Sequence, residues 1–117
     1  MIRPLAYVTA DFNKDEDDAH LEATTICRLL YESGYSPVCP YLAQSHFISF
    51  EVPQEYKDSR DMAHEFLRRS RILVVCSPYY TEEMMEDMAI AKKYGIATVT
   101  MDGIVKIAQE RDGTINE

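Results

Sequence analysis

The sequence has 117 residues, of which 46% are hydrophobic and 27% are charged, and its formal net charge is −8. This length and composition predict a single domain over residues 1-117 with one modest core. Proteins that bind the phosphate backbone of nucleic acids need a stripe of basic residues, and the negative net charge argues against one. We therefore expect no direct nucleic-acid binding. No apolar run approaches the ~20 residues of a membrane span, so we also expect no membrane partner.

The first part of the chain predicts two strands and one helix. Pro4 to Thr9 is short, apolar and β-prone, which indicates a buried strand. A polar segment over Asp11 to Asp18 then leads into a helix that is predicted to run to about Ser33 and to stop at Gly34. Its buried face is predicted from the residues Ala19, Ala23, Ile26, Cys27 and Leu30. Ser36 to Cys39 is predicted to be the second strand.

The second part of the chain alternates helices and strands after one irregular stretch. Tyr41 to Pro53 has no clear period and is predicted to be a functional or covering loop. A helix over Gln54 to Ser70 is expected to face inward with Tyr56, Ala63, Phe66 and Leu67. The remaining predicted elements are a strand over Ile72 to Cys76, a helix over Thr81 to Tyr94, a strand over Ile96 to Met101, and a short helix or turn over Ile104 to Glu110.

This alternation predicts an α/β fold with right-handed crossovers: a three-layer Rossmann-like or flavodoxin-like domain whose parallel sheet has about four to five strands. The three cysteines, Cys27, Cys39 and Cys76, are widely spaced in apolar surroundings. We interpret them as reduced core residues of a cytoplasmic protein rather than as metal ligands or disulfides.

Ligands of such sheets bind beyond the carboxyl ends of the strands. The segments expected to line a cleft are therefore Thr9 to Asp18, the stretch from Tyr41 onward, and Ser77 to Thr81. The sequence contains no G-x-G-x-x-G or G-x-x-x-x-G-K-[ST] motif and no His/Cys cluster with zinc spacing. We therefore expect no cofactor and no metal.

Four carboxylates occupy the first two turns of the helix predicted over Thr81 to Tyr94. At about 100° per residue, Glu82 and Glu86 face water on the side away from the apolar stripe. Asp87 lies only about 70° and Glu83 about 110° from the centre of that stripe. Asp87 and Glu83 are therefore the carboxylates expected to face a cleft.

Two stretches of the chain carry a resemblance to a known family. They are G-Y-S-P-V-C-P, which begins at Gly34, and T-E-E-M-M-E-D-M-A-I-A-K-K-Y-G-I, which begins at Thr81. With a tyrosine in the first strand, this pattern resembles the nucleoside 2-deoxyribosyltransferase-like superfamily, and most of all its small, poorly characterised phage and bacterial members. The resemblance covers about Pro4 to Met101.

The resemblance implies a nucleoside or nucleotide ligand and, in active relatives, retaining cleavage or transfer of an N-glycosidic bond. It implies Asp87 as the nucleophile and Tyr7 as the residue that orients it. The implied substrate-binding residues are Thr9, Asp11, Phe12, Ser77, Pro78, Tyr79 and Glu83. It also implies a homo-oligomer, because relatives complete their pockets with a neighbouring subunit.

Three functions stay open at this stage. The first is the enzyme just described, and the second is a catalytically degenerate protein of a phage or mobile element that binds or sequesters a nucleotide signal. The second is favoured by three differences from the family pattern: Asp87 stands for a glutamate, Glu83 for a glycine and Arg71 for an aspartate. The third is an inhibitor that contacts a protein partner through its acidic surface.

Overall fold

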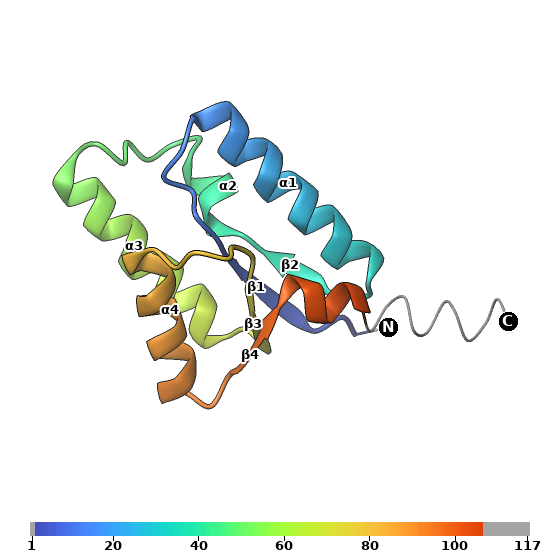
Figure 1. The fold of residues 1–117 in the computed structure, drawn as a ribbon. Coiled ribbons are helices and arrows are strands. Elements are labelled where there is room, and N and C mark those ends of the chain that lie inside the picture. Colours follow the sequence, from blue (N-terminus) through green and yellow to red (C-terminus); the bar gives the residue numbers. More distant parts are fainter. Residues whose placement is uncertain (1, 107–117) are drawn as a thin grey trace, which may run out of the picture.

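The computed structural model describes residues 2–106 and shows helices alternating with parallel strands. In chain order the elements are β1 (Leu5–Thr9), α1 (Glu16–Glu32), β2 (Ser36–Val38), α2 (Pro40–Gln44), α3 (Pro53–Arg68), β3 (Ile72–Val75), α4 (Glu82–Lys93) and β4 (Ala97–Thr100), as Figure 1 shows. Residues 101–106 form a further helical turn. The predicted helix or turn over Ile104 to Glu110 therefore starts earlier than expected, and its part beyond residue 106 lies outside the described residues.

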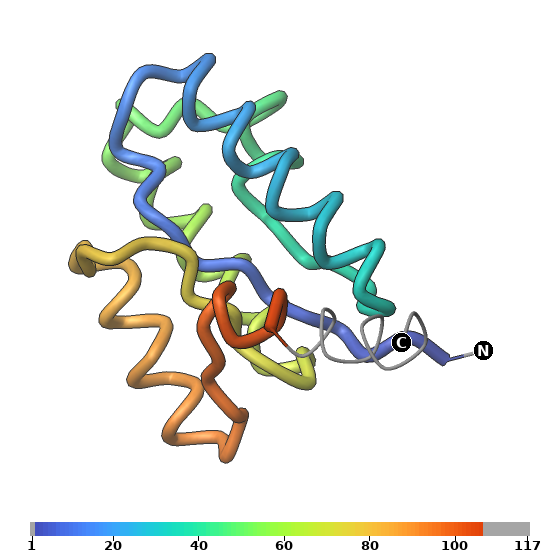
Figure 2. The backbone as a smooth tube through the Cα atoms, turned by 45° about the vertical axis from the view of Figure 1, so that its right-hand side comes forward, coloured from blue at the N-terminus to red at the C-terminus, as the bar shows by residue number. Residues whose placement is uncertain are grey.

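The four strands form one all-parallel sheet in the order β2-β1-β3-β4. Helix α1 lies on one face of the sheet, and α3 and α4 lie together on the other, as the two views in Figures 1 and 2 agree. This arrangement confirms the predicted three-layer α/β fold. From β1 the chain continues to β2 on one side, and from β3 it continues to β4 on the other, so the strand order reverses between β1 and β3. Open parallel sheets bind their ligands at such a switch point.

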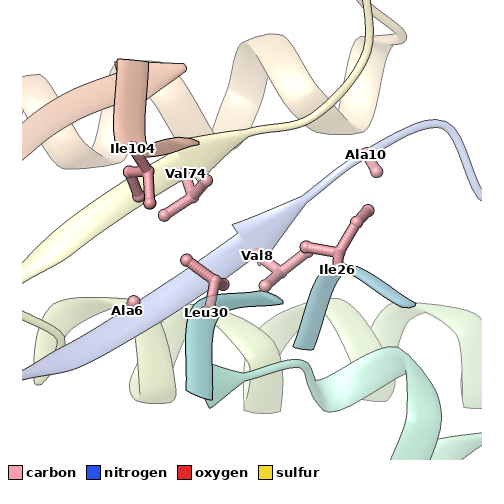
Figure 3. Packing of buried hydrophobic residues seen from close by; sticks show 7 residues of the cluster. All are labelled: Ala6, Val8, Ala10, Ile26, Leu30, Val74 and Ile104. Carbon is pink, nitrogen blue, oxygen red and sulfur yellow. The ribbon is translucent and has the colours of Figure 1, made fainter. Parts of the chain in front are cut away.

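Two hydrophobic clusters hold the layers together. On the α1 side, Ala6 and Val8 of β1 pack with Leu30 and with Ile104 from the last described turn (Figure 3). On the other side, Tyr7 packs with residues from α3, β3 and α4, namely Ala63, Leu67, Leu73 and Ala91. Because successive strand residues point to opposite faces, Tyr7 lies on the face that α3 and α4 cover.

Three predictions about local structure need correction. The stretch from Tyr41 is not irregular at its start, because Pro40–Gln44 forms a helix. Phe66 does not face inward and is 51% exposed, since the buried residues of α3 recur every four positions at Ser59, Ala63 and Leu67 and Phe66 lies about 100° away from Leu67. The cysteines are free, as expected, but half-buried at the edge of the first cluster.

No helix within residues 2–106 is long and apolar enough to cross a membrane.

The α1 side of the core can be tested with two leucines of the same helix. Leu30 is 0% exposed whereas Leu21 is 67% exposed. We expect Leu30→Ala to lower the free energy of unfolding by about 2–5 kcal/mol, because it leaves a cavity in the core. Leu21→Ala makes the same chemical change on the water side and should alter it by less than about 0.5 kcal/mol. Urea denaturation of both variants measures the difference, and equal losses would contradict the packing described here.

Candidate functional site

A pocket of about 510 Å³ lies at the carboxyl edge of the sheet. Its walls come from the end of β1 and the segment after it, from α2 and the segment that follows, and from the N-terminal parts of α3 and α4. The volume lies within the range of about 300–1,000 Å³ that is typical of small-molecule sites.

Five of the residues predicted from the sequence line this pocket, and they come from β1, the segment after it and α4. They are Tyr7, Thr9, Phe12, Glu83 and Asp87. Glu82 and Glu86 are exposed, as their helical phase predicts.

The other four predicted residues do not line the pocket. Asp11 instead shapes the loop, since its carboxylate accepts a hydrogen bond of 2.9 Å from the backbone N–H of Asn13. Ser77, Pro78 and Tyr79 belong to the loop after β3, and the Tyr79 side chain is 80% exposed. The predicted self-association stays a prediction, for which the exposed Tyr79 and Tyr80 are candidate contacts.

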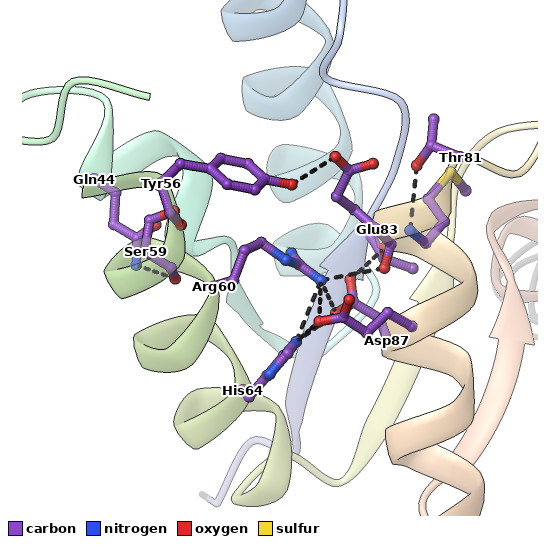
Figure 4. Close-up of polar contacts among 11 residues, drawn as sticks. Gln44, Tyr56, Ser59, Arg60, His64, Thr81, Glu83 and Asp87 are labelled. Carbon is purple, nitrogen blue, oxygen red and sulfur yellow. Dashed lines mark hydrogen bonds and ion pairs between the residues drawn. The ribbon is translucent and has the colours of Figure 1, made fainter. Parts of the chain in front are cut away.

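Asp87 is the most buried charged group of the site, with 2% of its surface exposed. Both of its carboxylate oxygens accept hydrogen bonds: Oδ2 from Thr9 Oγ1 at 2.7 Å, and Oδ1 from Arg60 Nη2 at 2.9 Å (Figure 4). Burial raises the pKa of this carboxyl, while the charge of Arg60 and the Thr9 hydrogen bond act in the opposite direction. Each oxygen of Asp87 therefore has a hydrogen-bond donor, and the carboxylate lies at the back of the pocket.

Tyr7 lies on the same side of the sheet and lines the same pocket. Burial raises the pKa of its phenol, and the negative charge of Asp87 raises it further. The phenol therefore stays neutral at physiological pH and can donate a hydrogen bond to a ligand.

Arg60 of α3 is the main residue that the sequence analysis missed. Its Nη2 also donates to the backbone carbonyl of Glu83 at 3.2 Å and lies 3.5 Å from Glu86 Oε1. His64, one turn further along α3, contacts the same Glu86 oxygen at 2.8 Å. Arg60 and His64 flank Ala63 on the inward face of the helix, so the phase argument applied to α4 would have found them on α3.

The Arg60 side chain is held mostly through one end of its guanidinium. Its Nε is buried and has no hydrogen-bond partner among the residues that the structure describes. Burial acts to lower the pKa of Arg60, but the neighbouring charges of Asp87 and Glu86 outweigh it, and the net direction is upward. The group is therefore a permanent cation whose charge is matched by carboxylates of α4.

A second contact between α3 and α4 lies beside the pocket. The Tyr56 hydroxyl donates to Glu83 Oε1 at 2.7 Å. Burial and the Glu83 carboxylate together raise the pKa of Tyr56 to about 12. For Glu83, burial acts to raise the pKa, but the hydrogen bond from Tyr56 and the charge of Arg60 outweigh it, so the pKa is lowered. Glu83 therefore stays ionised at neutral pH.

An aromatic wall forms the opposite part of the pocket lining, and it consists of Phe12, Tyr41 and Phe50. The rings of Phe12 and Tyr41 are stacked with centroids 4.3 Å apart and planes inclined by 11°. Tyr41 and Phe50 are stacked at 5.8 Å and 10°. The sequence analysis identified Phe12 but not the other two rings, which lie in the stretch without a clear period.

No group of three or more His, Cys, Asp or Glu residues within the described part of the chain could hold a metal ion. The arrangement offers a flat apolar surface at one end, and hydroxyl, carboxylate and guanidinium groups at the other.

Comparison with known proteins gives one match. A family model described as a domain of unknown function, DUF7768, matches residues 4–101, a range that contains the whole sheet and every residue that lines the pocket. Among curated proteins, none is similar enough to count as a match. The resemblance to the nucleoside 2-deoxyribosyltransferase-like superfamily stays a prediction.

The ion pair between Arg60 and Asp87 predicts a pH-dependent loss of stability. In Arg60→Met, Asp87 loses the cation that lowers its pKa, so that burial raises this pKa further above the unfolded value. Near pH 7 the unpaired carboxylate should then cost about 3 kcal/mol of unfolding free energy. Near pH 4 the carboxyl takes up its proton in the folded protein, so the loss should shrink.

Urea denaturation at both pH values measures this loss, and Arg28→Met is the matched control. Arg28 forms an ion pair with Glu32 on the exposed surface of α1, and its removal should cost less than about 1 kcal/mol at either pH. A loss in Arg60→Met that is equal at both pH values would contradict the role assigned to Asp87.

Proposed function

Because the chain belongs to the DUF7768 family, a domain of unknown function, we propose from the site itself that the protein binds a nucleoside or nucleotide. The ligand occupies the pocket at the carboxyl edge of the sheet. Its base lies against the aromatic wall, and its sugar lies toward Tyr7, Thr9 and Glu83.

The observation that carries this proposal is that two different chemistries line one cavity. Phe12, Tyr41 and Phe50 stack on one another and line the cavity, which gives it an apolar aromatic wall against which a base can pack. The other end offers hydroxyl groups and carboxylates, which suit the hydroxyl groups of a sugar. A nucleoside has the same two parts, because it joins a flat base to a sugar ring that carries hydroxyl groups.

The geometry favours binding without turnover. A carboxylate nucleophile has to reach the anomeric carbon, whereas Asp87 is 2% exposed and each of its oxygens is held by one hydrogen bond. Glu83 and Arg71 stand where active relatives have other residues, and these differences also favour binding without turnover. A sequestering or sensing protein is therefore the function that the site supports best.

Cleavage of the N-glycosidic bond is the second candidate, because Asp87 and Tyr7 line the same pocket. In this reaction an Asp87 oxygen would form a bond to the anomeric carbon while the bond to the base nitrogen breaks and the base leaves with the electron pair and takes up a proton. Water or a second base would then displace the carboxylate. An Asp87 oxygen would have to reach the anomeric carbon from a side chain that is 2% exposed.

Ligand binding can be tested by thermal denaturation with a panel of nucleosides and 5′-nucleotides. A compound that binds only the folded state raises the midpoint, and we expect at least one member of the panel to do so.

Phe12→Ala should weaken that affinity about 5- to 100-fold, because a base stacked on an aromatic ring gains roughly 1–3 kcal/mol. Phe47→Ala is the matched control, since Phe47 is 66% exposed and does not line the pocket. An equal effect of both substitutions would contradict the assignment.

Turnover can be tested by chromatography of free base after incubation with the same compounds. We expect no base release by the wild-type protein, because Asp87 is 2% exposed and is held by Thr9 and Arg60. Base release by the wild-type protein would contradict binding without turnover. If that release disappears in both Asp87→Asn and Asp87→Ala, it would establish the second candidate. Release that survives both substitutions would exclude Asp87 as the nucleophile.

A further inference from the structure

We propose that Glu83 makes the pocket select an unphosphorylated nucleoside over the corresponding 5′-phosphate. The inference rests on the proposed function and specifies its ligand class. It follows from where the charges of the pocket lie and from which of them are already paired.

Carboxylates outnumber cations in the pocket lining. The charged side chains that line it are Lys14, Glu16, Glu51, Arg60, Glu83 and Asp87. Lys14 is paired with Glu22 of α1. The other cation, Arg60, is paired with Asp87. A phosphate would therefore enter an acidic pocket in which both cations already have carboxylate partners, and the repulsion is strongest where water is excluded.

The Arg60 guanidinium is the group best placed to oppose this conclusion, since arginine forks are common phosphate ligands. Its Nη2 is held by Asp87 at 2.9 Å and by the Glu83 carbonyl at 3.2 Å. Its Nε is enclosed by protein and does not reach the pocket surface. A phosphate that took over Nη2 would leave Asp87 as a buried carboxylate without its counter-ion.

The N-terminus of α4, another usual phosphate ligand, is already satisfied by its own residues. The hydroxyl of Thr81 accepts a hydrogen bond of 3.2 Å from the backbone N–H of Met84. Glu82 and Glu83 in the first turn supply the negative charge that suits this end of a helix. An incoming anion would therefore meet carboxylates where other proteins offer free N–H groups.

Glu83 is the carboxylate best placed to contact a ligand. It lines the pocket, and unlike Asp87 it is not buried. Tyr56 occupies one of the about four acceptor positions of its carboxylate. The side chain of Asn13 is a second donor to it. The remaining acceptor capacity suits a sugar hydroxyl or an amino group, whereas a phosphate would present only acceptors and like charge.

Isothermal titration at low ionic strength tests the selection, with the four ribonucleosides and their 5′-monophosphates as probes. For the base that binds best, we expect the nucleoside to bind at least about tenfold more tightly than its monophosphate. Glu83→Gln keeps the size and the acceptor for Tyr56 but removes the charge, and should reduce this ratio to about threefold or less. Glu83→Asp keeps the charge and should retain the preference.

Glu82→Gln is the matched control, because it makes the same change of net charge at the neighbouring exposed position outside the pocket. It should leave the ratio unchanged. A wild-type protein that binds the monophosphate as tightly as the nucleoside would overturn this inference and leave the proposed function standing. A ratio that is the same in Glu83→Gln as in the wild type would remove Glu83 from the selection. Binding of neither compound would overturn the proposed function itself.

Discussion

The contact between Arg60 and Asp87 is the interaction on which the rest of the site depends. It joins α3 to α4, and the Thr9 hydroxyl extends it to β1, so that three elements distant in the sequence meet at one carboxylate. A carboxylate this deeply buried is tolerated only with such partners. The same bonds that make the burial possible give each oxygen of Asp87 a donor and hold Nη2 of Arg60 against α4. Glu83 is consequently the carboxylate of α4 that is left for a ligand.

The two ends of the pocket differ in how they are held. The polar end is built on β1, α3 and α4, whose side chains are tied by hydrogen bonds and by the second hydrophobic cluster. The aromatic wall is built from Tyr41 of α2 and from Phe12 and Phe50 in segments between regular elements, and its rings stack on one another. A ligand that bridges both ends therefore contacts a rigid polar surface and a more adaptable apolar one.

The sequence predicts those parts of the fold that local periodicity encodes. The apolar repeat from Ala19 to Leu30 and the unbroken run of β3 locate their elements within a few residues. Helical phase also identifies Asp87 as the carboxylate beside the core. The phase of α3 would have placed Arg60 on the inward face, but its pairing with Asp87 spans 27 residues and depends on how two helices pack, which no single period reports. The five-residue helix α2 is too short to show a period.

One contiguous segment, residues 40–51, supplies a large share of the pocket wall. Within the described chain it contributes no residue to either hydrophobic cluster, and Gln44 anchors it to α3 through a hydrogen bond of 3.2 Å to the Ser59 carbonyl. This part of the pocket wall is thus encoded apart from the two hydrophobic clusters, whereas Tyr7 and Ala63 belong both to the wall and to the second cluster. Exchange of this segment between homologues would diversify ligand choice while the sheet and the buried ion pair stay intact, which is a route by which such a domain can diverge.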